Sequence, residues 1–131
     1  MKEEQKYTLT LTESQLRLMA QCIEDCHRFA SGQMELANTT AMVKNRGEFC
    51  RKLNELQPYM TPELSRGSSY KWSGIGCPDE YQRKFIARTY YIYREIYHQL
   101  RIQNEHDGYN VYDSPTLTCK DSGEQIKIQK V

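Results

Sequence analysis

Residues 78–104 read PDEYQRKFIARTYYIYREIYHQLRIQN and predict the longest helix of the chain. Pro78 suits the first turn of a helix, where its missing N–H would have no partner. Asp79 and Glu80 then complement the positive end of the helix dipole. We therefore expect a helix from near Pro78 to about Asn104. Its apolar face follows the three-to-four-residue spacing of a buried side: Phe85, Thr89, Ile92, Tyr93, Ile96 and Leu100.

The other side of this predicted helix is basic, with five basic residues and one acid between Tyr81 and Arg101. Tyr91 would be exposed among positive charges there, which suits stacking on a base or meeting a phosphate. The alternatives are an ordinary solvated basic face or a dimer seam that uses tyrosine. A helical projection assigns six residues to this side, with Lys84 and Arg88 at its boundary: Arg83, Ala87, Tyr91, Arg94, His98 and Arg101.

Two further helices are predicted upstream. Thr12 with Gln15 three residues later forms a capping-box pattern, and apolar residues at helical spacing extend this first helix to about Val43. Gly32 lies inside it, where glycine costs about 1 kcal/mol relative to alanine, so we expect a close packing contact or a local bend. A shorter second helix should end at Pro58.

Both chain ends predict extended segments. Residues 7–11 alternate in the period of a short strand. Residues 116–119 and 125–130 form a predicted hairpin whose turn lies at residues 121–123. We therefore predict an α+β fold in a single domain, residues 1–131. It has a helical core of two long helices and one short helix, and a small antiparallel sheet from the N-terminal strand and the C-terminal hairpin.

The bulk composition excludes some partners and compartments. Eighteen basic residues face seventeen acidic ones, whereas proteins that coat duplex nucleic acid usually have a basic excess. The N-terminus has no apolar signal region, and no stretch approaches the ~18 apolar residues of a membrane span. Five cysteines without framework spacing are typical of reduced thiols. We expect a cytoplasmic protein with neither membrane nor duplex nucleic acid as partner.

Residues with catalytic or metal-binding chemistry form no recognisable constellation. Cys22, Cys26 and His27 give a C-x3-C-H group, but structural zinc sites usually show two compact ligand pairs. Glu24 and Asp25 are interpreted as solvated helix charges. We therefore predict no metal site, no cofactor and no catalytic residue, and we do not expect an enzyme.

The longest irregular stretch is residues 65–77, SRGSSYKWSGIGC, which contains the single tryptophan. Loops of this length are often functional. Glycines before a helix can bind phosphate through backbone N–H groups, but Pro78 removes one donor and Asp79 already occupies the helix end. A phosphate seated there is disfavoured. Trp72 either lines a pocket or plugs the core, and the sequence leaves both open.

Residues 7–36, YTLTLTESQLRLMAQCIEDCHRFASGQMEL, resemble the opening of a group of small bacteriophage proteins. In that group a strand leads into a helix with an arginine, a small residue and a Gly-Gln pair, here Arg28, Ser31, Gly32 and Gln33. Residues 69–98 resemble phage and gut-bacterial proteins. The chain is similar to phage anti-defence sponges, above all the first-described Thoeris anti-defence family. Those proteins capture cyclic ADP-ribose-type and cyclic oligonucleotide signals without cleaving them.

That resemblance implies oligomers with pockets lined by arginine and aromatic side chains. Tyr70 and Trp72 would stack a base while arginines pair with phosphates. We expect a non-enzymatic protein that sequesters a nucleotide-derived immune signal in the host bacterial cytoplasm, blocks anti-phage defence and forms a homodimer or higher homo-oligomer. The implied ligand-binding residues are Arg28, Gln33, Tyr70, Trp72, Arg83, Lys84, Arg88, Tyr91 and Arg94.

Two other functions stay open at this point. A phage or mobile-element protein could bind a host protein through the tyrosine-rich third helix. A nucleotide-cleaving enzyme is the least favoured reading, because the sequence offers no acid–base pair for it.

Overall fold

A computed structural model describes residues 3–131, and within them the chain is helical. The predicted α+β fold is wrong: no strand, and hence no antiparallel sheet, occurs in the described part of the chain. None of the described helices combines the length and the apolar character needed to cross a membrane. The elements are the helices α1 (Glu13–Ala30), α2 (Arg46–Met60) and α3 (Glu80–Gln103) and the 3-10 turns η1 (Thr39–Met42), η2 (Val111–Asp113) and η3 (Lys120–Ser122).

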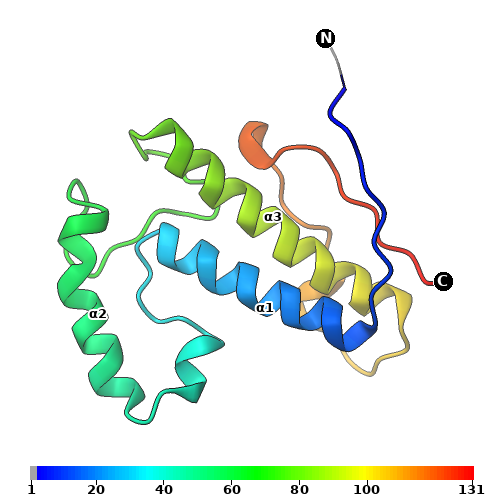
Figure 1. Cartoon of the computed structure of the whole chain (residues 1–131), viewed down its shortest axis with the longest axis horizontal. Coiled ribbons are helices and arrows are strands. Elements are labelled where there is room, and N and C mark those ends of the chain that lie inside the picture. Colours follow the sequence, from blue (N-terminus) through cyan, green and yellow to red (C-terminus); the bar gives the residue numbers. More distant parts are fainter. Residues whose placement is uncertain (1–2) are drawn as a thin grey trace.

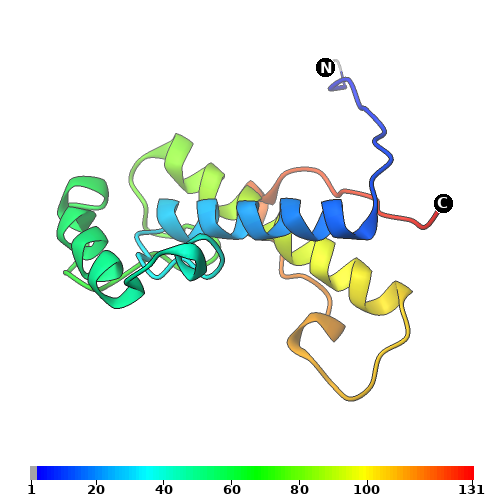
Figure 2. The same ribbon diagram turned by 60° about the horizontal axis from the view of Figure 1, so that its bottom comes forward.

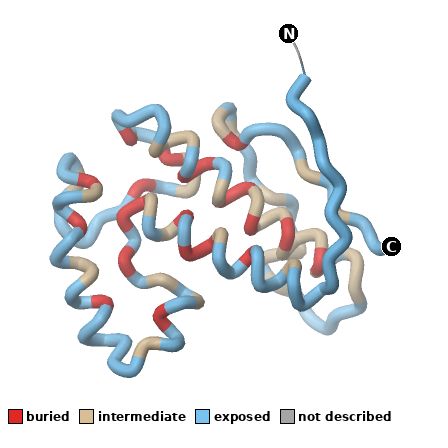
Figure 3. Tube along the Cα trace, viewed as in Figure 1, coloured by how far each residue is buried: buried red, intermediate tan, exposed pale blue. Residues whose placement is uncertain are grey.

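Helix α3 is the centre of the arrangement. It packs along α1 on one side, and the C-terminal segment with η2 and η3 runs along it on another (Figure 1). Helix α2 lies beyond one end of this pair and packs chiefly against η1 (Figure 2). Buried residues follow the facing sides of α1 and α3, whereas most of α2 is exposed (Figure 3). We call α1, α3 and the C-terminal segment the body, and α2 with η1 the arm.

The terminal segments are extended but do not pair as strands. Tyr7, on the predicted N-terminal strand, is 86% exposed. In the C-terminal segment the Ile126 N–H donates to the Tyr91 hydroxyl (3.1 Å), and the Ile128 carbonyl accepts from Gln103 Nε2 (2.6 Å). Side chains of α3 therefore satisfy backbone groups that a neighbouring strand would satisfy in a sheet.

Helix α1 begins as predicted and ends early. The Thr12 hydroxyl accepts from the Gln15 N–H, and the Gln15 side chain accepts from the Thr12 N–H, so the capping box is confirmed. The helix ends at Ala30 instead of Val43. Gly32 has φ +89°, a left-handed conformation that terminates helices and favours glycine. The glycine therefore ends α1 and does not bend it.

Helix α2 continues through Pro58 to Met60, so the predicted stop at Pro58 is wrong. Proline removes one N–H, but the next turn still closes because the Thr61 N–H donates to the Gln57 carbonyl (3.0 Å). Thr61 also packs closely on the loop after α1, because a Cβ added at Gly32 would lie 3.3 Å from the Thr61 side chain. The close packing expected at Gly32 is thus present.

One buried side chain connects the arm to the rest of the chain. Gln57 Nε2 donates to the carbonyls of Gly32 (3.1 Å) and Ser68, and Gln57 Oε1 accepts from the Gly67 N–H (2.7 Å). Gln57 is 2% exposed, so these bonds replace its hydration completely. The amide holds two loops to α2.

Helix α3 confirms the prediction to within two residues at each end. Asp79 caps it, with its carboxylate accepting from the Gln82 N–H (2.8 Å). The largest core cluster is built mainly on α3: Ala20, Tyr90, Tyr93, Ile96 and Leu100. A smaller cluster joins α3 to the loop before it: Tyr70, Cys77 and Ile86.

Candidate functional site

Six ring side chains form one aromatic cluster in the body: His27, Trp72, Tyr90, Tyr93, Tyr97 and Tyr112. They come from α1, the loop before α3, α3 itself and η2. The Trp72 and Tyr90 ring centres are 5.1 Å apart, and those of Tyr97 and Tyr112 are 4.9 Å apart. Trp72 is half-buried, so it packs against the core and still presents part of its indole. The prediction that Trp72 packs on the core is therefore confirmed in part, and the prediction that it lines a pocket stays a prediction.

Arg94 is the cation of this cluster. Its guanidinium carbon lies 4.8 Å from the centre of the Tyr112 ring and 5.6 Å from that of Tyr90. Among residues 3–131 it has neither an ion-pair partner nor a side-chain hydrogen bond. Two tyrosine rings therefore orient the guanidinium by cation–π contact and leave its N–H donors open to an anion.

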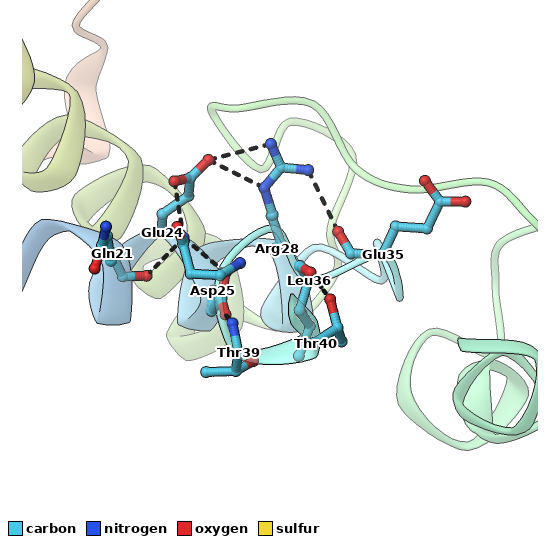
Figure 4. A network of polar contacts seen from close by, with 9 residues as sticks. Gln21, Glu24, Asp25, Arg28, Glu35, Leu36, Thr39 and Thr40 are labelled. Atoms are coloured by element: carbon cyan, nitrogen blue, oxygen red, sulfur yellow. Dashed lines mark hydrogen bonds and ion pairs between the residues drawn. The ribbon is translucent and has the colours of Figure 1, made fainter. Parts of the chain in front are cut away.

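Arg28 is less available than Arg94 to pair with an anion. It pairs with Glu24 through Nη2 (3.1 Å), and its Nη1 donates to the Glu35 carbonyl (3.4 Å), as Figure 4 shows. Glu24 also accepts from Asn38 Nδ2 (3.1 Å) and is 8% exposed, so the interpretation as a solvated charge is wrong. A carboxylate already neutralises Arg28, and a phosphate would have to displace it.

Asp25 is also buried, and its role is structural. Its two oxygens accept from the N–H groups of Asn38 (3.1 Å) and Thr39 (2.6 Å), at the start of η1 (Figure 4). Burial raises the pKa of Asp25, but these hydrogen bonds outweigh burial and hold its pKa below 3.8. The carboxylate fastens the loop after α1 onto that helix.

His27, Tyr93 and Tyr97 of the cluster are neutral near pH 7. His27 Nδ1 lies 2.8 Å from the Ile86 carbonyl, which can only accept, so Nδ1 carries the proton. Burial lowers the pKa of His27, and the Arg28 charge acts in the same direction. Burial raises the pKa of Tyr97 to about 12 and raises that of Tyr93, with the Glu24 charge adding to both. The phenols therefore remain hydrogen-bond donors.

A second group of predicted site residues faces the C-terminal segment. Arg83 pairs with Asp121 (3.1 Å), and exposed Arg88 runs beside Gly123. Tyr91, predicted to be exposed, is 3% exposed. The C-terminal segment covers that side of α3, and the Tyr91 hydroxyl accepts a backbone N–H from it. These residues therefore do not join the aromatic cluster.

Three predicted residues belong to neither group. Lys84 pairs with Glu80 one turn earlier on α3 (2.7 Å), and Gln33 is exposed in the loop after α1. Tyr70 is buried, its N–H donates to the Ser31 carbonyl (2.8 Å), and its hydroxyl has no partner among the described residues. Tyr70 is a core residue here and cannot stack on a ligand.

Gly74 lets the loop that carries Trp72 approach α3 closely. Gly74 has φ +70°, and a Cβ there would lie 2.9 Å from the Arg83 carbonyl oxygen of α3. Only glycine allows the loop to approach the helix this closely. This close approach could not be predicted from the sequence, because it depends on how the loop before α3 packs against the helix.

The surface hollows and the exposed cysteines involve none of the predicted site residues. One open hollow of about 570 Å³ is lined by residues 104–107. A second, of about 450 Å³, is lined by residues of α2 and by Glu35. None of the predicted site residues lines either hollow. Cys22 and Cys26 are exposed on α1. Within residues 3–131 no three metal-ligating side chains gather into a possible ion site.

Comparison with protein-family models, with curated proteins and with solved structures gives no match to this chain.

Proposed function

We propose that the chain binds and sequesters a nucleotide-derived immune signal, a cyclic ADP-ribose isomer or a cyclic oligonucleotide, at the aromatic cluster. The ligand is held and not cleaved, and its removal blocks bacterial anti-phage defence. One observation carries the proposal: the Arg94 guanidinium lies against two tyrosine rings with no acidic partner among the described residues. A half-buried arginine oriented by aromatic rings suits a phosphate next to a base.

The binding mode follows from what is free in the cluster. A phosphate accepts charge-assisted hydrogen bonds from Arg94, and the base stacks on the exposed part of Trp72. Arg28 plays a smaller part because Glu24 already neutralises it. We therefore centre the site on Trp72 and Arg94 and leave out the buried Tyr91.

The setting of this function is also a proposal. Cyclic nucleotide signals act in the host bacterial cytoplasm, so we place the chain there, as a homodimer or higher homo-oligomer. Neither hollow described above lies at the aromatic cluster.

A host-protein partner for the tyrosine-rich α3 has less support. Tyr90, Tyr91 and Tyr93 are buried between α1 and the C-terminal segment, whereas Tyr81 is exposed at the start of the helix. A tyrosine-based interface needs exposed rings. Pull-down from host lysate that returns a stoichiometric protein and no small molecule would favour this alternative.

Isothermal titration against cyclic nucleotides and cyclic ADP-ribose isomers tests the proposal. Wild type should bind at least one of them. Arg94→Gln should weaken that binding about tenfold to a hundredfold, the value of a hydrogen bond to a charged group.

Arg88→Gln is the matched control, because it removes the same charge from an exposed position on the same helix. It should change affinity by less than about twofold, as expected for a screened charge. The proposal fails if wild type binds nothing in the panel, or if Arg88→Gln costs as much affinity as Arg94→Gln.

A further inference from the structure

Helix α2 carries an apolar stripe on its solvent side. We define the α2 stripe as Phe49, Leu53, Leu56 and Met60, which follow one another at spacings of four, three and four residues. This is the spacing of a helix–helix seam. Phe49 is 41% exposed and Leu56 is 51% exposed, while the other two are half-buried.

The chain itself covers this stripe only in part. The buried side of α2 is the line of Cys50 and Gln57, which faces the loops that Gln57 holds. The α2 stripe lies next to that line around the helix. Figures 1 and 3 show α2 set apart from α1 and α3, with most of its length exposed.

The chain exposes more surface than a compact monomer of its mass. The accessible area is 9565 Å², whereas a compact monomer of 15.5 kDa exposes about 7,200 Å². A standard interface removes about 800 Å² from each partner, so the surplus is large enough to form one.

We propose that the α2 stripe is the seam of a homodimer in which the α2 helices of two copies pack antiparallel. A two-fold axis between Leu53 and Leu56 sets each of these leucines against the other in the partner. The same axis sets Phe49 against Met60 of the partner subunit. The stripe is therefore complementary to itself, as an isologous dimer requires.

Charge is compatible with this pairing. Arg51 pairs with Glu48 and Glu55 within α2, and these three residues lie on the side of the helix opposite the α2 stripe. These three charged residues therefore lie outside the seam. The formal net charge of the chain is +1, so two copies repel each other weakly.

The interface stands apart from the ligand proposal, because none of its residues touches the aromatic cluster. Light scattering coupled to size exclusion should give twice the 15.5 kDa of one chain for wild type at micromolar concentration. Leu56→Glu should give one chain, because it places two buried charges at the seam.

Ile102→Glu is the control, because Ile102 on α3 is also 51% exposed. It should remain a dimer. Circular dichroism checks that both variants keep their helices, and Phe49→Glu replaces Leu56→Glu if that variant loses helicity. A monomeric wild type, a dimeric Leu56→Glu with intact helices, or a monomeric Ile102→Glu would each overturn the proposal.

Discussion

The body and the arm are stabilised in different ways. In the body, α1 and α3 bury aromatic and aliphatic side chains along their length, and the C-terminal segment adds backbone hydrogen bonds to side chains of α3. In the arm, α2 depends on η1 and on the amide of Gln57. A helix held by so few buried groups unfolds locally at lower free energy than one inside a core.

This difference separates the two proposed roles. A ligand site needs side chains held in place, and Arg94 is held by rings from α3 and η2 within the body. A dimer seam needs accessible apolar surface, and the α2 stripe of the arm offers it. Substitutions that weaken one region should therefore leave the other largely intact.

The largest expected effect comes from removing core volume in the body. Ile86 is fully buried, so Ile86→Ala should lower the free energy of unfolding by about 2–5 kcal/mol. Tyr59→Ala, at an 85% exposed position of α2, should change it by about 0.5 kcal/mol or less. Urea unfolding followed by circular dichroism measures both. Equal losses would show that the arm is as deeply packed as the body.

A smaller effect should come from the connection between the two regions. Gln57→Ala leaves the carbonyls of Gly32 and Ser68 and the N–H of Gly67 without the Gln57 amide, at a cost of about 1–3 kcal/mol. Hydrogen exchange should speed up in α2 and in the loop after it, with α1 and α3 unchanged.

Lys52→Ala, exposed on the same helix, is the control for this experiment and should leave exchange in α2 as in wild type. Faster exchange spread evenly over all three helices would mean that arm and body unfold as one unit.

The smallest expected effect is a pH dependence of the free energy of unfolding, caused by His27 in the body. Burial lowers the pKa of His27 below 6.5, so the unfolded chain binds this proton more readily than the folded chain. The free energy of unfolding should therefore fall as the pH drops through 6.5, and keep falling until folded His27 is protonated.

His27→Gln can still donate to the Ile86 carbonyl but does not titrate. Urea unfolding between about pH 5 and 8 should show a flatter dependence for this variant than for wild type. An unchanged slope would mean that His27 does not contribute to it.

Local signals in the sequence predicted the helices correctly where caps decide them. Thr12 with Gln15, and Asp79 ahead of α3, fix helix starts through bonds within four residues of the chain. Gly32 was recognised as unusual, but its left-handed φ, which ends α1, was not foreseen. The sheet was mispredicted because pairing depends on distant partners, and α3 side chains took the place of a neighbouring strand.

The candidate site was predictable by residue type and less so by position. Trp72 and Arg94 each lie against the Tyr90 ring. Tyr112, the second ring against Arg94, was missed because it reaches the site through tertiary packing of η2. The pairing of Arg28 with Glu24 was readable from their four-residue spacing on a helix. The burial of Tyr91 was not, because it depends on the C-terminal segment.

The single indole also gives the chain an intrinsic optical probe. Since Trp72 is the only tryptophan, all indole fluorescence arises from one loop, with the Tyr90 ring 5.1 Å away and the guanidinium of Arg94 against that same tyrosine. Emission wavelength and quenching therefore report on whether this loop is docked on α3. Rapid-mixing experiments on the unlabelled wild-type chain can follow the loop directly, without any label or substitution.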